Sequence, residues 1–392
     1  MVDLTKDRSD CCGCSACMSS CPRSAITLKP DAEGFLYPEI DAEKCNGCGI
    51  CLKVCDFKKR EVLPPNYKKV FALQHSSKDV LKTSTSGGAF TAISDVFLKR
   101  GAVVYGAFLD DNFDTYHIAA GTTEERDKLK GSKYVQSDMR NVFHEIKQLL
   151  TEDMEILFVG TPCQTAGLHS YLGKDYPKLF TMDFICHGTP SQMLFKEHIR
   201  FLESKTKKKA VCYQFRDKKF GWIHTESVGF ADGTIYYSLP VIKFNALFHS
   251  DLGLRPACYS CKYANLRRYS DITIGDYWGV EKAHRIYDNR GTSLVIINSE
   301  KGQNVIDSLS EDCKLIPSDI KLAMQNGMKR PVKMPRCRDD FWQLFRLSGY
   351  DAATEKYAPV TARMRISTIS KRALYTLHVD KLAIKMKSKL RK

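Results

Sequence analysis

The sequence lacks the features that would place it in a membrane or outside the cell. No apolar run reaches about 18 residues, so we expect no transmembrane helix. The first ten residues, MVDLTKDRSD, hold no apolar segment of the kind that a secretory signal needs. No low-complexity segment is present either. We therefore expect a cytoplasmic protein whose 392 residues form two or three domains.

Two phosphate-binding signatures are also missing. No Gly-x-Gly-x-x-Gly run follows a predicted strand, so a Rossmann nicotinamide site is not supported. No loop ends in Gly-Lys-Ser or Gly-Lys-Thr, which excludes a Walker loop. The net charge of +15 would suit nucleic acid, an anionic membrane or an acidic redox partner. Because no nucleic-acid-binding motif accompanies the charge, we expect no nucleic-acid partner.

Cysteine, by contrast, is abundant, and half of the 16 cysteines form two runs near the N-terminus. Each run reads Cys-x2-Cys-x2-Cys-x3-Cys, and this doubled spacing is typical of two-cluster ferredoxins. In such modules three cysteines of one run bind a 4Fe–4S cube and the fourth crosses to the other cube. Zinc sites and disulfides are the alternatives, but zinc sites usually use two short pairs, and disulfides are rare in a reducing cytosol. The predicted ligands are Cys11, Cys14, Cys17 and Cys55 for the first cluster, and Cys45, Cys48, Cys51 and Cys21 for the second.

One cysteine of this segment, Cys12, falls outside the spacing and is interpreted as a bystander. After the cysteine runs, residues 63–66 (Leu-Pro-Pro-Asn) predict a linker, because two prolines stiffen the chain. Strands and helices then alternate. Two apolar strands, 155–159 and 179–185, with a helix at 166–172 between them, predict a β-α-β unit. From about residue 210 the pattern is richer in strands, and Asp232-Gly233 within residues 228–237 predicts a hairpin turn.

Four further cysteines are placed so that they can meet at one edge of the sheet. Cys163 and Cys186 each follow a predicted strand, and neighbouring parallel strands end at the same edge, where open sheets bind ligands. Cys258 and Cys261 form a Cys-x-x-Cys pair in a separate loop. Four thiols suffice for a third cube or for one zinc ion. The alternative is that two of them are small buried residues and that the pair is incidental.

Two loops carry groups that suit a charged, planar cofactor. Residues 84–88 precede a predicted helix, where hydroxyls and N–H groups can bind phosphate, although ordinary helix caps look the same. Residues 133–137 combine a cation, a ring and an amide, or else form a solvated loop. Clusters exchange single electrons whereas organic substrates exchange pairs, so we expect a flavin as the converter. The candidate contacts are Ser84, Thr85, Ser86, Gly87 and Gly88 in the first loop, and Lys133, Tyr134, Val135, Gln136 and Ser137 in the second.

A series of short motifs covers most of residues 70–300. They are STSGGAF (84–90), GSKYVQS (131–137), GTPCQTAGL (160–168), ICHG (185–188), FRDKKFGW (215–222), CYSCKYA (258–264), DITIGDYWG (271–279) and the stretch 291–298. Together they resemble the family of coenzyme F-420 hydrogenase/dehydrogenase beta subunits. The resemblance implies an FAD-binding domain, with flavin contacts in residues 84–88 and 133–137. It also implies that Cys163, Cys186, Cys258 and Cys261 ligate a third 4Fe–4S cluster.

The resemblance further implies a class of reaction. We expect an iron–sulfur flavoprotein oxidoreductase that passes electrons between 4Fe–4S clusters and FAD, and so reduces or oxidises a small molecule that exchanges two electrons. Archaeal members of the family act on a deazaflavin and a plant relative on a chlorophyll derivative, so the resemblance fixes no substrate. The alternative is an electron-transfer subunit without a substrate of its own, which feeds a partner enzyme.

Two residues beside Cys186 are candidates for proton transfer. Asp183 and His187 flank the cysteine, and a carboxylate and an imidazole near a reduced flavin can deliver a proton to a substrate. The alternative roles are a hydrogen bond in the core for Asp183 and a plain loop position for His187. Arg216 and Asp217 are interpreted in the same way, either as functional groups or as a structural ion pair.

The last part of the chain is strongly basic. Residues 361–392 carry ten Lys or Arg and one acid, Asp380, and an apolar stripe recurs at helical spacing. Such a helix can lie on an anionic membrane at the inner face, or pack on its own domain with its charges solvated. The fold class that we expect is α+β: a ferredoxin module at 1–62, an α/β flavin-binding catalytic domain at 67–348 and a basic helical tail at 349–392. The stripe consists of Tyr375, Val379, Leu382, Met386 and Leu390.

Overall fold

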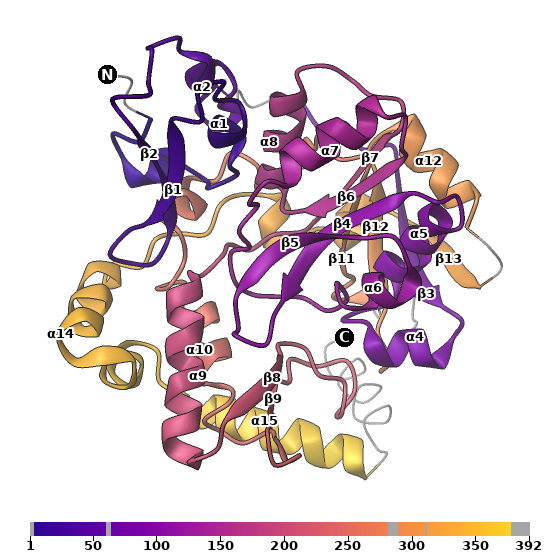
Figure 1. Ribbon diagram of the computed structural model, residues 1–392. Helices are drawn as coiled ribbons and strands as arrows, with labels where there is room; N and C mark the ends of the chain where they lie inside the picture. Colours follow the sequence, from indigo (N-terminus) through magenta and orange to yellow (C-terminus); the bar gives the residue numbers. More distant parts are fainter. Residues whose placement is uncertain (1–3, 60–63, 281–288, 310–311, 378–392) are drawn as a thin grey trace.

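The computed structural model describes residues 4–59, 64–280, 289–309 and 312–377 (Figure 1). Within them the chain forms a small N-terminal module, a central eight-stranded sheet flanked by helices, and a three-stranded sheet. The mixture of helix and sheet, with a module of ferredoxin type first, is the fold class that the sequence predicts. Of the predicted linker, residues 63–66, the first lies outside the described residues, and residues 64–66 form no helix or strand.

The N-terminal module repeats one short structure around its two cysteine runs. Each run places a cysteine in a single-turn helix, and each helix follows a residue in the left-handed region, Ser15 (φ 69°) or Gly49 (φ 71°). This backbone lets the chain turn tightly around its thiols, and it costs least at glycine. The elements are η1 (Arg8–Asp10), α1 (Ala16–Ser19), the antiparallel pair β1 (Ile26–Pro30) and β2 (Leu36–Ile40), α2 (Ile50–Lys53) and α3 (Asp56–Lys59).

The central sheet has the strand order β13-β3-β12-β11-β7-β6-β4-β5. Strands β4, β6, β7 and β11 run parallel to one another, and the other four pair antiparallel. The predicted β-α-β unit is confirmed as β6, α8 and β7. The strands are β3 (Lys69–His75), β4 (Val103–Leu109), β5 (Thr115–Ala120), β6 (Ile156–Gly160), β7 (Leu179–Phe184), β11 (Ile272–Asp276), β12 (Ser293–Ile297) and β13 (Cys313–Ser318).

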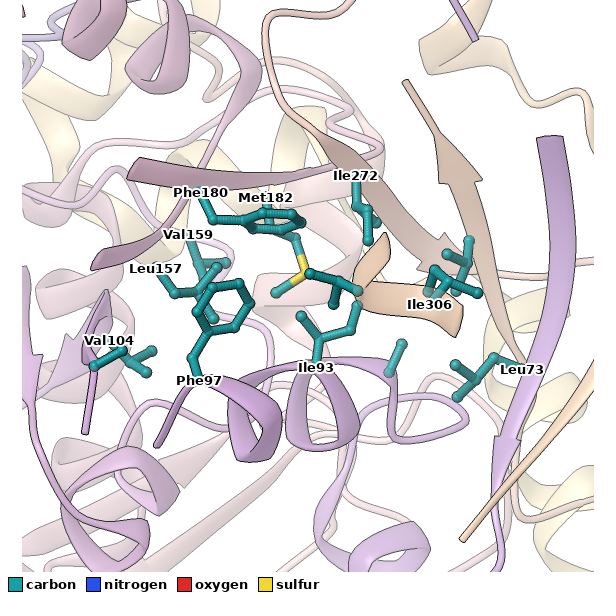
Figure 2. Close-up of a cluster of buried hydrophobic side chains, with 14 of the residues drawn as sticks. Leu73, Ile93, Phe97, Val104, Leu157, Val159, Phe180, Met182, Ile272 and Ile306 are labelled. Carbon is teal, nitrogen blue, oxygen red and sulfur yellow. The ribbon is translucent and has the colours of Figure 1, made fainter. Parts of the chain in front are cut away.

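Helices cover both faces of this sheet. On one face, α5 (Ala89–Leu98) and α12 (Glu300–Asp307) pack on alternate strand residues such as Leu157 and Met182, and Phe97 contacts Phe180 with ring centroids 4.9 Å apart (Figure 2). On the other face lie α7 (Val142–Thr151) and α8 (Pro162–Leu172). Burying a side chain of this size contributes about 1.5–3 kcal/mol, so the alternation fixes the register of the strands.

The ferredoxin module rests on the second of these helical layers. Its helices α1 and α3 lie against α8, and Ala16 and Val54 enter the same apolar cluster as Phe143 and Leu168 (Figure 1). The module is therefore joined to the rest of the protein through a buried apolar contact rather than through the linker alone.

A three-stranded antiparallel sheet, β10-β9-β8, forms a second layer below the central sheet. The hairpin of β9 and β10 turns at Asp232 and Gly233, as the sequence predicts. The elements here are α9 (Gln192–Thr206), β8 (Ala210–Gln214), β9 (Ser227–Phe230), β10 (Ile235–Tyr236) and α10 (Lys243–His249). The remaining ones are α4 (Lys78–Thr83), α6 (Thr123–Asp127), η2 (Pro256–Ser260), α13 (Ile320–Ala323) and η3 (Asn326–Met328).

Two helices complete the described chain. In α14 (Arg338–Tyr357) the backbone breaks at Gly349, close to the predicted start of the tail, but Tyr350 and Ala353 beyond it are buried against Leu194. In α15 (Ala362–Thr376), Ile366 and Ile369 are exposed. Among the described residues, no helix has the length and apolar character needed to cross a membrane. The side chains of the predicted tail stripe all lie outside the described part.

Candidate functional site

The cysteines of the ferredoxin module form two groups. Burial raises the pKa of Cys17, and the nearby thiols of Cys14, Cys11 and Cys55 raise it further. Burial also raises the pKa of Cys55, and the thiols of Cys14 and Cys11 raise it further. Cys55 thus lies with the first run although it ends the second. This is the crossed grouping that the spacing predicts, and the ligand roles themselves stay a prediction.

The second group surrounds a small pocket of its own. Cys21, Cys45, Cys48 and Cys51 all line it, together with apolar residues of β1 and β2. Burial raises the pKa of Cys51, and Cys48 and Cys21 add to the effect. Cys48 is exposed, whereas every cysteine of the first group is partly covered. Cys51 is buried, so the second group reaches the molecular surface through Cys48, whereas no cysteine of the first group is exposed.

A third set of four thiols gathers at the end of the central sheet. Cys163 lies in the first turn of α8, Cys186 follows β7, and Cys258 and Cys261 lie in and just after η2. Burial raises the pKa of Cys186 far above its ordinary value, and Cys258, Cys163 and Cys261 raise it further. Three separate segments thus bring together the cysteines that the sequence singled out.

Helix α8 begins four residues earlier than the sequence pattern predicts, and this places Cys163. Thr161 caps the helix, because its hydroxyl accepts from the N–H of Gln164 and its own N–H donates to Oε1 of Gln164 at 2.9 Å. Pro162 occupies the first helical position, where its missing N–H costs nothing.

Among the described residues, no group of three or more His, Cys, Asp or Glu is arranged to hold a metal ion directly.

Cys12, interpreted from the sequence as a bystander, lies between two of these thiol groups. It is buried, and its thiol is a neighbour of Cys14 in the module and of Cys163 in α8, which are the leading causes of its strongly raised pKa. Sequence spacing alone contains no signal for this contact, since Cys12 has no place in either cysteine run.

The first predicted cofactor loop, residues 84–88, forms hydrogen bonds with Thr292 and Ser293 at the start of strand β12. The hydroxyl of Ser293 accepts from the N–H of Gly87 at 2.9 Å and from that of Ala89 at 3.4 Å, and Ser86 donates to the carbonyl of Thr292 at 2.7 Å. Two N–H groups of the predicted phosphate site are therefore engaged within the protein. Thr85 accepts from the N–H of Ser132 at 2.9 Å, so this loop does meet the second candidate loop.

The side chains of the second loop, residues 133–137, have protein partners. Lys133 donates to the carbonyls of Leu129 and Lys130, each at 2.8 Å, and burial lowers its pKa to about 7. Tyr134 stacks on Phe248 with centroids 4.7 Å apart, and Val135 is buried. Flavin contact by this loop stays a prediction.

The last two residues of this loop face inward. Gln136 donates to the carbonyl of Cys12 at 3.0 Å and so points at the ferredoxin module. Ser137 donates to Nδ1 of His117 at 2.9 Å, and the Nε2–H of that histidine donates to the carbonyl of Val159 at 3.0 Å. These bonds tie the loop to the end of β6 beside Cys163.

The two candidate proton donors differ in exposure. Asp183 is fully buried, accepts from the hydroxyl of Thr273 at 2.6 Å, and lies 3.6 Å from the guanidinium of Arg268. This environment fits the alternative reading of a core hydrogen bond. His187 is half-buried and its Nε2 lies 2.6 Å from Oδ1 of Asp251. A catalytic role for either residue stays a prediction.

Arg216 and Asp217 do not pair with each other. Arg216 is buried and binds Asp276 at 2.7 Å and the hydroxyl of Tyr134 at 3.0 Å. Asp217 instead accepts from the hydroxyls of Ser227 and Tyr237. The two side chains therefore have different partners, and the predicted ion pair between them is not formed.

Comparison with known proteins assigns both parts of the chain. Residues 10–59 match the 4Fe-4S dicluster domain. Residues 153–321 match the family described as the C terminus of the coenzyme F420 hydrogenase/dehydrogenase beta subunit. That segment belongs to this family. The recognition made from the sequence motifs is confirmed, and the match contains all four cysteines of the third set.

Individual relatives of the family domain and of the module are similar at low identity. A component of the F(420)H(2) dehydrogenase of Methanosarcina mazei is 22% identical over 325 residues, which cover 78% of this chain and 84% of that protein. The ferredoxin-type protein NapF of Escherichia coli K12 is 38% identical over 42 residues, 11% of this chain and 26% of NapF. A chain of the F420-reducing NiFe hydrogenase complex from Methanosarcina barkeri has a TM-score of 0.44 and 18% identity, covering 74% of this chain and 91% of its own.

The dicluster domain and the domain of the beta-subunit type together identify an iron–sulfur redox protein of an oxidoreductase family. The chain spans most of the length of its Methanosarcina mazei relative but about a quarter of NapF, with which it shares only the cysteine-rich segment.

Proposed function

We propose that this protein is a cytoplasmic iron–sulfur flavoprotein oxidoreductase, which carries single electrons through three 4Fe–4S clusters and exchanges electron pairs with a small molecule at an FAD. The observation that carries the proposal is the third thiol set. Cys163, Cys186, Cys258 and Cys261 come from three segments, are all partly buried, and influence one another's pKa. Four converging thiols next to a dicluster module are the donor set that a further cube requires.

Each cluster has residues to hold it. Cys11, Cys14, Cys17 and Cys55 would bind the first, Cys21, Cys45, Cys48 and Cys51 the second, and the third set the third. A bound 4Fe–4S cube supplies one-electron transfer. The surrounding chain limits solvent access to the first and third sites, since Tyr263 and Phe57 pack over Cys12, Cys14 and Cys261. A dry environment of this kind helps to set the potential of a cluster.

The flavin would bind where the two candidate loops meet. A converter between one-electron and two-electron chemistry is needed, and FAD supplies it. The bond between Thr85 and Ser132 brings both candidate loops together at the N-terminus of α5. Because Ser293 already engages two N–H groups there, a phosphate would bind through the remaining groups, Ser84 and the N–H of Phe90 among them. His187 is the better placed proton donor, since it is half-exposed and adjoins Cys186.

An electron-transfer subunit that feeds a partner enzyme is the second candidate, and one feature favours it. A groove of about 790 Å³ runs between the module and helices α7 and α8, and Cys21 lies in its wall. Among the described residues that line it, Lys53 and Lys147 are basic and none is acidic. Such a groove suits an acidic redox protein, which would deliver electrons close to the second cluster.

A peripheral contact with an anionic membrane is a further part of the proposal. Helix α15 exposes Ile366 and Ile369, and Leu377, directly after its last residue, is exposed as well. Arg363 and Arg365 on the same helix add positive charge. An apolar stripe beside basic residues is the pattern of helices that lie at a membrane surface.

The experiment that tests the proposal is an anaerobic inventory of iron, sulfide, zinc and flavin. The full chain should carry about 12 irons, taking four per cube, and one FAD. Cys258→Ser should lower the iron content by about four and leave the module loaded, whereas Cys212→Ser, an exposed cysteine outside the three sets, should change nothing. About eight irons with no flavin in the unaltered chain would overturn the flavoenzyme and favour the electron-transfer subunit.

A further inference from the structure

Arg255 is a buried cation at the boundary between the ferredoxin module and the catalytic domain. Its side chain is almost completely buried, although it comes from the loop that leads into η2. Nε donates to the carbonyl of Cys11 at 2.6 Å, Nη2 to the carbonyl of Leu36 at 2.9 Å, and Nη1 to Oε1 of Gln136 at 2.9 Å. The guanidinium also lies 4.2 Å from the ring centre of Tyr37. Arg255 thus binds the module at several points and the domain at one.

The charge of Arg255 faces sulfur. Burial by itself would lower its pKa, but Cys11, Tyr37, Cys12 and Cys258 raise it overall. Nη2 lies 3.5 Å from Sγ of Cys11, and the carbonyl of Arg255 accepts from the N–H of Cys258 at 2.8 Å. A buried charge is costly unless an opposite charge compensates it. With the clusters bound, the ligating thiolates of the first and third sites would supply that opposite charge.

The backbone beside Arg255 leaves no spare room. A Cβ at Gly13 would lie 2.5 Å from Nε2 of Gln136 and 2.9 Å from Nη1 of Arg255, and Gly13 itself has φ +73°. On the other side of the contact, Cys12 lies between Cys14 and Cys163. The first thiol group and the third set are thus held against each other by a guanidinium, an amide and a thiol.

We propose that Arg255 is the positioning residue of an electron-transfer junction between the first cluster of the module and the third cluster. This inference rests on the proposed function, because it assigns the order of the clusters: the exposed second cluster, then the first, then the third. With the clusters bound, Cys11, Cys14, Cys17 and Cys55 would hold the electron donor of this junction and Cys163, Cys186, Cys258 and Cys261 its acceptor, so that one electron lost at the first site would be gained at the third. No bond forms or breaks and no proton moves. A low-potential electron carrier supplies the electron at the second cluster.

The position of Arg255 makes a selective prediction about potentials. A fixed positive charge favours the more negative, reduced state of a cluster, and its effect is large where water is excluded. Removing the charge should lower the potentials of the first and third clusters. The second cluster has no described contact with Arg255 and its potential should not change, so it serves as a control within the same molecule.

The test is a redox titration of the full chain with dithionite, followed by electron paramagnetic resonance. In Arg255→Gln, the ratio of reduced to oxidised first and third cluster at a fixed potential should fall about tenfold, which is about 59 mV for a one-electron centre. Arg255→Lys keeps the charge without the planar fork, so it should restore most of this ratio. Arg126→Gln removes another buried arginine, which binds Asp95 within the catalytic domain, and should leave all three ratios unchanged.

Several outcomes decide the matter. Unchanged potentials in an Arg255→Gln protein with full iron would overturn the junction, and so would an equal shift of all three clusters. If the Arg255→Gln protein does not retain its iron, electron paramagnetic resonance of the fully reduced, unaltered chain still tests the order of the clusters. Magnetic coupling of the third cluster to the first is expected, and coupling to the second instead contradicts the proposed order. An unaltered chain with about eight irons would refute the third cluster. A selective shift in the potential of the first cluster in Arg255→Gln would then still show the effect of Arg255 on that cluster.

Discussion

Gly167 of helix α8 lies against Cys14 of the ferredoxin module so closely that a Cβ on the glycine would be 2.8 Å from the cysteine Sγ. The same Cβ would also be 2.8 Å from Cβ of Cys14, so the chain has no room for even one methyl group. The absence of a side chain at one helical position therefore sets how near the module approaches the domain of the central sheet.

Replacing Gly167 by alanine should separate the two parts. Overpacking of this kind typically costs about 1–3 kcal/mol, and the cost should fall on the site of Cys14. We expect a lower thermal midpoint and a partial loss of iron, measured per chain after anaerobic purification. Gly121→Ala is the matched control, because its Cβ would meet nothing nearer than 3.8 Å. Retention of full iron and stability in Gly167→Ala would contradict this account of the interface.

The buried pair of Arg216 and Asp276 should show strong energetic coupling. Breaking a buried ion pair from one side costs about 3–5 kcal/mol, because the remaining charge loses its partner. Arg216→Gln and Asp276→Asn should each destabilise the protein, and Asp276→Asn keeps an oxygen for the N–H of Trp222. The double variant should lose clearly less than the sum of the single variants in urea unfolding. Strict additivity would show that the pair contributes little.

Glu226 should make the protein less stable at alkaline pH. It is fully buried near Tyr213 and Tyr350, accepts from the N–H of Asn245 at 3.1 Å, and burial raises its pKa from 4.5 to about 8. The folded state keeps this proton above pH 4.5, where the unfolded chain has lost it. The contribution is therefore complete below about pH 4.5 and is lost as the pH rises through about 8.

Glu226→Gln removes this titration, so its stability should separate from that of the unaltered protein as the pH rises from about 4.5 to about 8. The expected gain in unfolding free energy above pH 8 is about 1.4 kcal/mol for each unit by which the pKa is raised. Unfolding curves at a series of pH values measure it. His198 nearby has a pKa lowered by burial to about 3, so its own titration acts at acid pH and is common to both proteins. Parallel pH profiles for the two proteins would refute the prediction.

The basic groove should determine how fast an acidic electron carrier reduces the protein. Lys53→Glu and Lys147→Glu reverse charges that line the groove, and each should slow reduction several-fold at low salt. The difference should shrink as ionic strength rises, because salt screens exposed charges. Lys128→Glu is the control for net charge, because this exposed lysine follows the last residue of α6 and does not line the groove. Equal slowing in all three variants would assign the effect to net charge alone.

Membrane contact can be tested on the tail. The full chain should sediment with anionic vesicles and much less with zwitterionic ones, since both basic and apolar groups contribute. Deleting residues 361–392 should remove most of this binding, while Arg363→Glu with Arg365→Glu should weaken it in a salt-dependent way. If the truncated chain binds as well as the full chain, the tail has no such role.

Local patterns explain what the sequence can predict. The cysteine runs, the strands around Cys163 and the hairpin at Gly233 each depend on residues close together in the chain. The β-α-β rule then places Cys163 and Cys186 at one edge, which the geometry reproduces. The apolar pattern predicts the start of α8 too late, because it does not include the capping of Thr161 by Gln164.

Contacts between distant segments are beyond the reach of the sequence. Ser293 occupies N–H groups of the loop at residues 84–88 from 206 positions away, so a loop that resembles a phosphate site is partly filled by its own protein. Asp183 adjoins Cys186 in sequence, but β-strand burial removes it from solvent. Arg255 and Cys12 follow no motif, and only tertiary packing reveals that they lie between two thiol groups.

The bond between Arg255 and Cys11 joins residues 244 positions apart. During synthesis the N-terminal module leaves the ribosome first and can fold while most of its partner surface does not yet exist. Its cysteines are therefore exposed to the cellular machinery of metal delivery before Arg255 covers Cys11. Closing a contact of such long range is slow, which prolongs this interval. Because Arg255 is synthesised and docks late, the maturation of the protein has two stages. The thiols of the N-terminal module are accessible in the first stage and covered in the second.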